Sequence, residues 1–325
     1  MLSRSRFLCS ALALAATGIV ATPVLANDAW PNKRITLVVP YPAGGSSDII
    51  ARSIGQLISQ ELKQTVVIEN KPGANGNLGA EFVSRAQPDG YTWLLADLGA
   101  LAISPSVYTK LSFDPSKDLR GAAMLAYSPH MLVVHPSLKA NNLKELVELS
   151  KKEDLNFAVT ATGSAPHLAG VELARLTGAK WVYVPYKGGV QAVQDTVAGQ
   201  TQILMNGMLA TYPHVQSGKL KLLGISKETR MPLISDVPTL AEQGAKGFAS
   251  GTWQGVVLPA KTPEAIVQRV NKVLVSAIRS PDVRARLTAQ GAELVTMSPV
   301  ETDKFFNAER ARWRTVVQTS NLQLD

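Results

Sequence analysis

Short runs of apolar and β-branched residues alternate along this chain with longer segments whose apolar positions have helical spacing. Continuous apolar runs predict buried strands, and apolar residues at i, i+3 and i+4 predict amphipathic helices. The predicted strands are 35–39, 65–69, 91–96, 131–135, 156–159, 181–184, 202–205, 220–225 and 253–258. The predicted helices are 48–62, 78–85, 142–151, 167–176 and 190–198, followed by a mostly helical stretch from 263 onward. This alternation predicts an α/β fold with a parallel or mixed sheet covered by helices.

The strand–helix alternation occurs in two successive blocks, which predicts two α/β lobes. The extended segments near 127–134 and 250–258 are the candidate crossings between the lobes. Two crossings would complete the first lobe with the C-terminal helices. We therefore expect residues 27–128 and 252–325 to form lobe 1, and residues 129–251 to form lobe 2.

The first 26 residues have a different pattern. Arg4 and Arg6 precede an apolar run, and Val24-Leu25-Ala26 places small or branched residues where a signal peptidase cuts. This predicts a secretory signal peptide (residues 1–26) that is cleaved near Ala26. The single cysteine, Cys9, lies within it, so the exported chain would contain no disulfide. An exported chain of this size without disulfides is typical of the bacterial periplasm.

Charge narrows the choice of partners. The chain has 33 basic and 25 acidic residues, a formal net charge of +8. The basic residues are scattered, and no dense basic block with interleaved aromatic residues occurs, so we do not expect a nucleic-acid partner. A mild positive field favours the capture of small anions as a weak steering effect.

Three turns rich in glycine and hydroxyl residues follow predicted strands. The carboxyl ends of strands are where ligands bind in such sheets. Glycines allow the backbone to approach a ligand, and a capped helix after the turn directs its first N–H groups toward an anion. The alternative is a plain strand-to-helix turn at each position. The candidate ligand-binding residues in these turns are Tyr41, Pro42, Ala43, Gly44, Gly45, Ser46, Ser47 and Asp48; Thr160, Ala161, Thr162, Gly163, Ser164 and His167; and Tyr186, Lys187 and Gly188. In the first turn, Ser46, Ser47 or Asp48 is the expected cap.

Two further segments supply candidates. Small residues at 97–108 would line the cleft floor through Gly99 and Ala102, although a loop before a helix is the alternative. Asn206 directly follows a predicted strand, so it would present its amide to the cleft.

Enzyme signatures are weak. The serine in Gly163-Ser164-Ala165-Pro166 lacks the flanking glycines of a nucleophile elbow, and neither nucleotide-binding glycine fingerprint occurs. The four histidines have no metal-site spacing, so we expect no metal and no cofactor. A Ser164–His167 pair is conceivable, but three residues apart on a turn usually means local capping.

Several motifs together resemble the Bug/TctC family of periplasmic solute receptors of tripartite tricarboxylate-type transporters. They span most of the chain after residue 26 and read "WPNKRITLVVPYPAGGSSDIIAR", "VVIENKPGANGNLGAEFV", "DGYTWLL", "TGSAPHLAG", "VPYKGGVQAVQD" and "DVPTLAEQG". The resemblance implies a type II periplasmic-binding-protein fold, with two α/β lobes joined by a hinge of crossing strands. It also implies a non-enzymatic receptor, expected to be a monomer, that passes a small carboxylate to membrane permease subunits. The turn at 41–48 would hold one carboxylate group, partly through ordered water, opposite the turn at 160–167.

The chain departs from the family pattern where the distal end of the ligand is expected. Asn206 stands where many relatives have an aspartate, and the segment "DLGALAISP" at 97–105 is also unusual. Without an acidic group at 206, an amino-acid ligand is less favoured, and a dicarboxylate or an aromatic carboxylate is more favoured. The alternatives are a periplasmic sensor for a signalling ectodomain and, more remotely, a hydrolase that uses Ser164.

Overall fold

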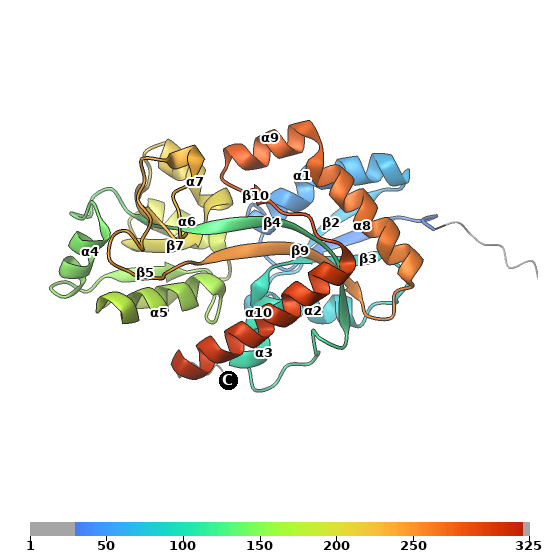
Figure 1. Ribbon diagram of the computed structural model, residues 1–325, viewed down its shortest axis with the longest axis horizontal. Helices are drawn as coiled ribbons and strands as arrows, with labels where there is room; N and C mark the ends of the chain where they lie inside the picture. The colour runs from blue at the N-terminus through green and yellow to red at the C-terminus, as the bar shows by residue number, and fades with distance from the viewer. Residues whose placement is uncertain (1–29, 321–325) are drawn as a thin grey trace, which may run out of the picture.

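The computed structural model describes residues 30–320 (Figure 1). Its strands are β1 (Ile35–Val39), β2 (Val66–Asn70), β3 (Thr92–Ala96), β4 (Leu119–Val134), β5 (Asn156–Val159), β6 (Val182–Pro185), β7 (Ile203–Gly207), β8 (Lys221–Ile225), β9 (Gly251–Pro259) and β10 (Glu293–Leu294). Its α-helices are α1 (Ser46–Leu62), α2 (Asn77–Ser84), α3 (Ser104–Val107), α4 (Leu143–Ser150), α5 (Ala165–Thr177), α6 (Gly189–Val197), α7 (Met208–Gln216), α8 (Glu264–Arg279), α9 (Pro281–Ala289) and α10 (Pro299–Ser320). Short 3-10 helices lie at η1 (Ala74–Gly76) and η3 (Pro232–Ile234), and η2 (Gly99–Ile103) is a π-helix.

The strands form a mixed sheet in the order β2-β1-β3-β9-β4-β7-β5-β6, and both β10 and β8 pair with β4. β1 runs parallel to β2 and β3, and β5 runs parallel to β6 and β7. β9 is antiparallel to both β3 and β4. The α/β class with a mixed sheet, predicted from the apolar pattern, is confirmed.

The long strand β4 joins two halves of the sheet. Its residues 119–129 pair with β9, whereas residues 130–134 pair with β7. We call β1, β2, β3, β9, β10 and residues 119–129 of β4 the first half, and β5 to β8 with residues 130–134 of β4 the second half. β4 and β9 run side by side through the middle of the molecule (Figure 1). The predicted strand 131–135 is therefore only the end of a longer strand.

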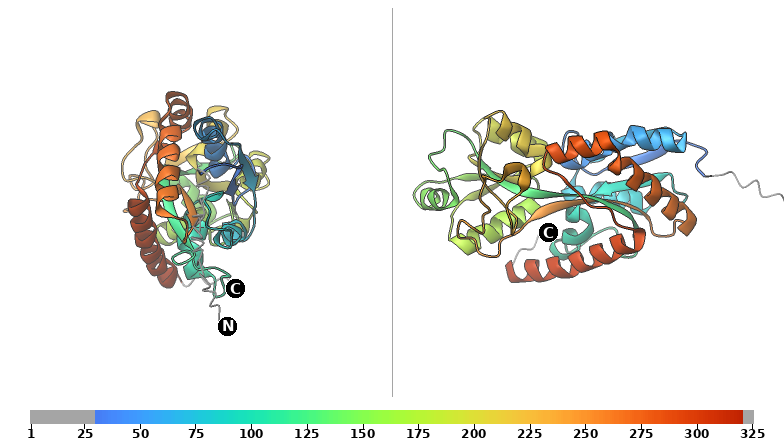
Figure 2. Two further views of the ribbon diagram at one scale, coloured as in Figure 1. Left: turned by 90° about the vertical axis from the view of Figure 1, so that its right-hand side faces the viewer. Right: turned by 45° about the horizontal axis from the view of Figure 1, so that its top comes forward.

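Helices cover both faces of the sheet, as Figure 2 shows. In the first half, one buried cluster joins α1, α8 and α9 to the strands, and a second cluster joins η2, α3 and α10 to the opposite face. In the second half, α4 and α5 pack on one face, and α6 and α7 pack on the other. The alternating apolar segments thus bury themselves in layers on either side of one sheet.

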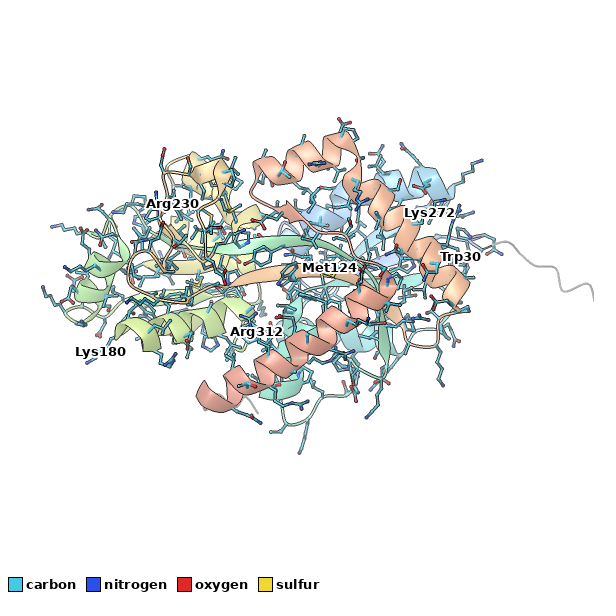
Figure 3. All side chains as sticks on the ribbon, viewed as in Figure 1. Trp30, Met124, Lys180, Arg230, Lys272 and Arg312 are labelled. Atoms are coloured by element: carbon cyan, nitrogen blue, oxygen red, sulfur yellow. The ribbon has the colours of Figure 1, made fainter. Side chains whose placement is uncertain are left out.

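Basic side chains are spread over the molecule. Figure 3 shows Lys180 and Arg230 over the second half and Lys272 over the first. Within residues 30–320, none of the helices has the length and apolar character needed to cross a membrane.

The sequence pattern placed most elements within a few residues, but it missed several others, among them the four-residue helix α3. Helix α7 was not predicted, since Pro213 lies inside it and interrupts the helical pattern. The first part of β4 and the short strand β10 were also missed. The signal peptide and its cleavage near Ala26 lie outside the described residues and stay predictions.

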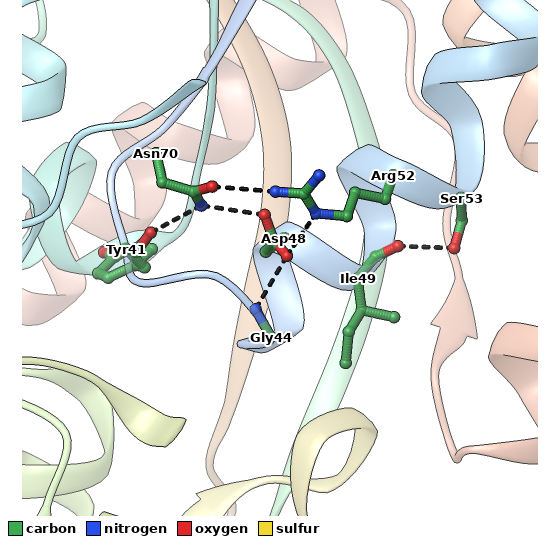
Figure 4. Close-up of polar contacts among 7 residues, drawn as sticks. All are labelled: Tyr41, Gly44, Asp48, Ile49, Arg52, Ser53 and Asn70. Carbon is green, nitrogen blue, oxygen red and sulfur yellow. Dashed lines mark hydrogen bonds and ion pairs between the residues drawn. The ribbon is translucent and has the colours of Figure 1, made fainter. Parts of the chain in front are cut away.

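A buried carboxylate anchors the turn between β1 and α1 (Figure 4). Asp48 Oδ2 accepts hydrogen bonds from the N–H of Gly44 at 2.9 Å and from Nε of Arg52 at 2.8 Å. Asn70 at the end of β2 donates to Asp48 Oδ1 at 2.9 Å and to the carbonyl of Tyr41 at 3.0 Å. Burial acts to raise the pKa of Asp48, but the bonds from Arg52, Gly44 and Asn70 outweigh burial and lower it. This network fixes the backbone of the 41–48 turn to the first half.

Replacing the Asp48 carboxylate should therefore destabilise the protein. For Asp48→Ala we expect a loss of about 2 kcal/mol in the free energy of unfolding at neutral pH, the scale of hydrogen bonds to a charged group. The folded-state pKa lies below the ordinary value of 3.8, so the stabilisation exists above that pH and is lost as the pH falls through the folded-state pKa. Denaturant titrations at neutral and acidic pH measure both effects. Glu61→Ala, an exposed acid on the same helix, is the control and should change stability by less than about 0.5 kcal/mol. Equal stability losses in the two variants would contradict the anchoring role.

Candidate functional site

A polar cavity of about 50 Å³ lies where the two halves of the sheet meet. A single water needs roughly 10–15 Å³, so the cavity has room for a small ligand or a few waters. It is lined by Tyr41, Gly45, Ser46, Ser47, Asn75, Asp97, Thr160, Ser164, Pro166, Gly189, Asn206, Gly207, Ala210, Thr252 and Gln254. Of the described residues that line it, none carries a basic side chain.

The N-termini of four helices meet at this cavity. The lining includes Ser46 at the start of α1, Ser164 before α5, Gly189 at the start of α6 and Gly207 before α7. The first N–H groups of a helix have no partner within the helix and carry partial positive charge. Four such termini around one space create a site for an anion without a cationic side chain.

In three of these four helices the N-cap residue is a glycine, which has no side chain to cap the first turn. The N-cap residues of α1, α6 and α7 are Gly45, Gly188 and Gly207, and none makes a side-chain capping bond. The expectation that Ser46, Ser47 or Asp48 caps α1 is wrong, because the helix already begins at Ser46. In α7, Ser128 Oγ accepts from the N–H of Leu209 at 3.1 Å. First-turn N–H groups are therefore left for a ligand or for water chiefly in α1 and α6.

Helix α5 is capped by the protein itself. Ser164 Oγ accepts from the N–H of His167 at 3.3 Å and from the hydroxyl of Thr160 at 3.1 Å. Because Oγ accepts both bonds, the hydroxyl hydrogen of Ser164 remains as a donor into the cavity that this residue lines.

Ser164 and His167 do not form a nucleophile–base pair. The imidazole Nδ1 of His167 accepts from the N–H of Gly163 at 2.9 Å, and only the backbone N–H of His167 contacts Ser164 Oγ. Burial lowers the pKa of His167 to about 4. A catalytic base needs its ring nitrogen within hydrogen-bond reach of the hydroxyl. The geometry is that of a capped helix start.

The cavity gathers part of the predicted site. The predicted residues that line it are Tyr41, Gly45, Ser46, Ser47, Thr160, Ser164 and Asn206. The remaining predicted residues are not among its lining residues: Pro42, Ala43, Gly44, Asp48, Gly99, Ala102, Ala161, Thr162, Gly163, His167, Tyr186, Lys187 and Gly188. Asp48 and His167 accept hydrogen bonds from the N–H groups of Gly44 and Gly163, which directly precede the lining residues Gly45 and Ser164 in the chain.

One carboxyl group in the lining was not predicted. Asp97 directly follows β3, and its Oδ1 accepts from the hydroxyl of Tyr41 at 2.5 Å and from the N–H of Gly99 at 2.7 Å. Burial raises the pKa of Asp97 to about 6, although the hydrogen bonds from Tyr41 and Gly99 act in the opposite direction. Its position at the carboxyl end of a predicted strand is a sequence feature that could have identified it as a ligand-binding candidate. The sequence prediction named only small residues of that segment.

The lining also holds a buried amide that has no partner. Gln254 on β9 is 0% exposed, and neither its Nε2 nor its Oε1 has a hydrogen-bond partner among the described residues. Its neighbour in the lining, Thr252, contacts Nε2 of His130 at 2.8 Å, and burial lowers the pKa of His130 to about 3, which keeps that ring neutral. Asn75, Pro166, Gly189, Gly207 and Ala210 complete the residues that the sequence prediction missed.

The two halves touch each other around the cavity. Nδ2 of Asn75 donates to the carbonyl of Gly163 at 3.2 Å. A side chain at Gly188 would collide with the ring of Pro42, since its Cβ would lie 2.6 Å from Pro42 Cδ. Leu209 of α7 is buried in the cluster under α1, so apolar packing also joins the halves. Direct contacts therefore join the two halves beside the cavity.

Comparison with known proteins agrees with this geometry. Residues 50–322 match the family described as the tripartite tricarboxylate transporter family receptor. The chain is 35% identical to the protein BugT of Bordetella pertussis, over 95% of each chain. It is similar to the structure of the periplasmic binding protein BugD, with 31% identity, a TM-score of 0.87 and coverage of 90% of this chain and 99% of that one. It is also similar to MatC from Rhodopseudomonas palustris with bound malate, at 33% identity and a TM-score of 0.84, covering 89% of this chain and 100% of that one.

The family match covers most of the chain, and the relatives match over nearly their full length. The type II periplasmic-binding-protein fold predicted from the sequence motifs is confirmed by the likeness to BugD. The family consists of receptors that bind solutes without transforming them, in agreement with the absence of a nucleophile–base pair at Ser164. This chain belongs to the TctC family of periplasmic solute receptors of tripartite tricarboxylate transporters.

Proposed function

We propose that the protein binds a small organic carboxylate in the cavity between the two halves and delivers it to the membrane subunits of a tripartite tricarboxylate-type transporter. The observation that carries this proposal is the meeting of four helix N-termini at one polar cavity, with the first turns of α1 and α6 uncapped. A carboxylate would accept charge-assisted hydrogen bonds from the free N–H groups and from the hydroxyl of Ser164. Export to the periplasm with cleavage near Ala26, and action as a monomer, belong to the same proposal.

The chemical class of the ligand is supported by a relative. MatC was solved with malate, a small carboxylate. The sequence-based preference for a dicarboxylate or an aromatic carboxylate rested on the lack of an acidic group at 206. Asp97 supplies an acidic group to the same cavity from another strand, so that premise no longer separates these ligands from an amino acid.

We further propose that the two halves are lobes that close on the ligand. The expected lobes, 27–128 with 252–325 and 129–251, change over close to the point where β4 exchanges β9 for β7 as its partner. Two strands that cross between lobes provide a hinge. The contacts of Asn75 with Gly163 and of Pro42 with Gly188 would form on closure.

The main alternative is a sensor that uses the same cavity but docks on a signalling ectodomain. Binding experiments do not separate the two roles, because both need the ligand. Solute uptake by cells that lack this chain separates them, since only the receptor role predicts lost uptake. The hydrolase alternative has no support from the contacts of Ser164 and His167.

The binding proposal is tested by thermal-shift and calorimetric screening of the protein against organic acids, amino acids and esters. We expect at least one small carboxylate to raise the melting temperature and no ester to be hydrolysed. Turnover of an ester, with no carboxylate bound, would overturn the proposal.

Removal of the Ser164 hydroxyl should weaken binding. For Ser164→Ala we expect carboxylate affinity to fall by about 1–2 kcal/mol, the scale of one hydrogen bond to a charged group. The variant also loses the cap of α5. Asn142→Ala is the matched control, because Asn142 caps α4 by accepting from the N–H of Glu145 at 2.8 Å and does not line the cavity. Calorimetry should show weakened binding in the first variant alone, and unchanged affinity in Ser164→Ala removes Ser164 from the site.

A methyl group at Gly188 should hinder closure. Its Cβ would meet the Pro42 ring at 2.6 Å, a clash that exists only when the lobes are together. Overpacking costs about 1–3 kcal/mol, so we expect Gly188→Ala to weaken ligand binding roughly tenfold to a hundredfold. If the ligand affinity of Gly188→Ala equals that of the wild type, closure against Pro42 is not part of binding.

A further inference from the structure

Two polar side chains of the cavity come from neighbouring parts of the sheet: Asp97 directly follows β3, and Gln254 lies on β9. β3 and β9 pair in antiparallel register with Ala96 opposite Gly255. Continued by one residue, this register places Asp97 opposite Gln254, and both line the cavity. Side chains opposite each other on antiparallel strands point to the same face. Asp97 and Gln254 thus form one polar wall.

Both groups have hydrogen-bonding capacity that the protein does not use. The carboxyl group of Asp97 accepts from Tyr41, from the N–H of Gly99 and from its own backbone N–H, and an ionised carboxylate has about four acceptor sites, so capacity for a further donor remains. Gln254 is fully buried, and its amide oxygen and nitrogen are both unpartnered within the described chain. A buried amide without partners is costly, so its retention in an apolar strand points to a partner from outside the protein.

The negative charge of Asp97 limits which ligand group can lie against this wall. Asp97 is the one carboxyl group among the described residues that line the cavity, and no basic side chain accompanies it there. Its pKa of about 6 leaves it ionised above that pH. A second carboxylate placed here would face a like charge, whereas an ammonium or a hydroxyl would donate to Asp97 and to the oxygen of Gln254.

We propose that Asp97 and Gln254 form a specificity subsite that takes a hydrogen-bond donor, an ammonium in preference to a hydroxyl, at the end of the ligand remote from its carboxylate. This inference rests on the proposed function, because it assumes that the helix N-termini hold the carboxylate. It assigns the protein an amino acid or a hydroxy acid as ligand rather than an unsubstituted dicarboxylate.

The test is calorimetric titration of the full protein with acids of equal length that differ only at the far end. The shorter series is butyrate, γ-hydroxybutyrate, γ-aminobutyrate and succinate, and the longer series is caproate, ε-aminocaproate and adipate. Measurements at about pH 8 keep Asp97 ionised. In the series that fits, we expect the amino acid to bind most tightly and the dicarboxylate to bind roughly tenfold or more weakly.

Variants of Asp97 and Gln254 test whether these two side chains cause the expected order of ligand affinities. Asp97→Asn removes the charge at nearly constant shape, so the advantage of the amino acid over the dicarboxylate should shrink by roughly tenfold or more. Asp89→Asn is the matched control, since Asp89 pairs with Lys33 at the surface and is not among the lining residues. Its order of ligand affinities should match that of the wild type. Gln254→Met removes the unpartnered amide. This variant should bind the amino acid more weakly, and the melting temperature of the free protein should rise. The weaker binding of the amino acid to Gln254→Met serves as a second readout if Asp97→Asn folds poorly.

The outcomes separate this inference from the proposed function. If a dicarboxylate binds as tightly as the amino acid of its series, or if Asp97→Asn leaves the order unchanged, the donor subsite is overturned while carboxylate binding stands. If no member of either series binds to the folded protein, the proposed binding of a small carboxylate is itself overturned.

Discussion

The pairing of β4 with β9 is the interaction on which the rest of the structure depends. Through it, one hydrogen-bonded ladder extends from the first half of the sheet to the point where β4 passes to β7. The cavity lies at this passage, because strand ends and helix starts from both halves meet there. A shift of this ladder by one residue would turn Gln254 and Thr252 to the other face of the sheet. The register of two strands therefore determines the composition of the site.

Local chemistry explains what the sequence predicted well. The cap at Asn142, the strand 156–159 and the glycine-rich turns depend on residues close to one another in the chain, so pattern and propensity suffice. The same turns contributed Tyr41, Ser46 and Ser164 to the cavity. Ser46 and Ser164 stand at helix starts, and Tyr41 lies in the turn before one. At such positions the local sequence predicts both the turn and the candidate ligand-binding residues.

Nonlocal pairing explains what the sequence did not show. Asp97 and Gln254 are far apart in the chain, and only the antiparallel register of β3 and β9 brings them together. Within the segment at 97–105, the sequence favours the small residues Gly99 and Ala102 as lining, whereas the residue that lines the cavity is Asp97. The absence of an acid at 206 was then interpreted as absence of an acid from the cleft. A comparison of single sequence positions cannot show that a different strand contributes an acidic side chain to the same cavity.

Closure of the cavity has a consequence for the release of a ligand. In the proposed opening of the two halves, the bond from Asn75 to Gly163 and the burial of Leu209 against the first half would both be given up. In the proposed transport cycle, a bound carboxylate adds its own bonds to this cost, so spontaneous opening becomes rarer as binding becomes tighter. A membrane partner that takes the ligand must then bind the open form more strongly than the closed form, and the difference in its affinities limits how firmly the receptor can hold its ligand. Because part of that difference is spent on breaking the contacts between the halves, stronger contacts lower the highest ligand affinity that still allows release.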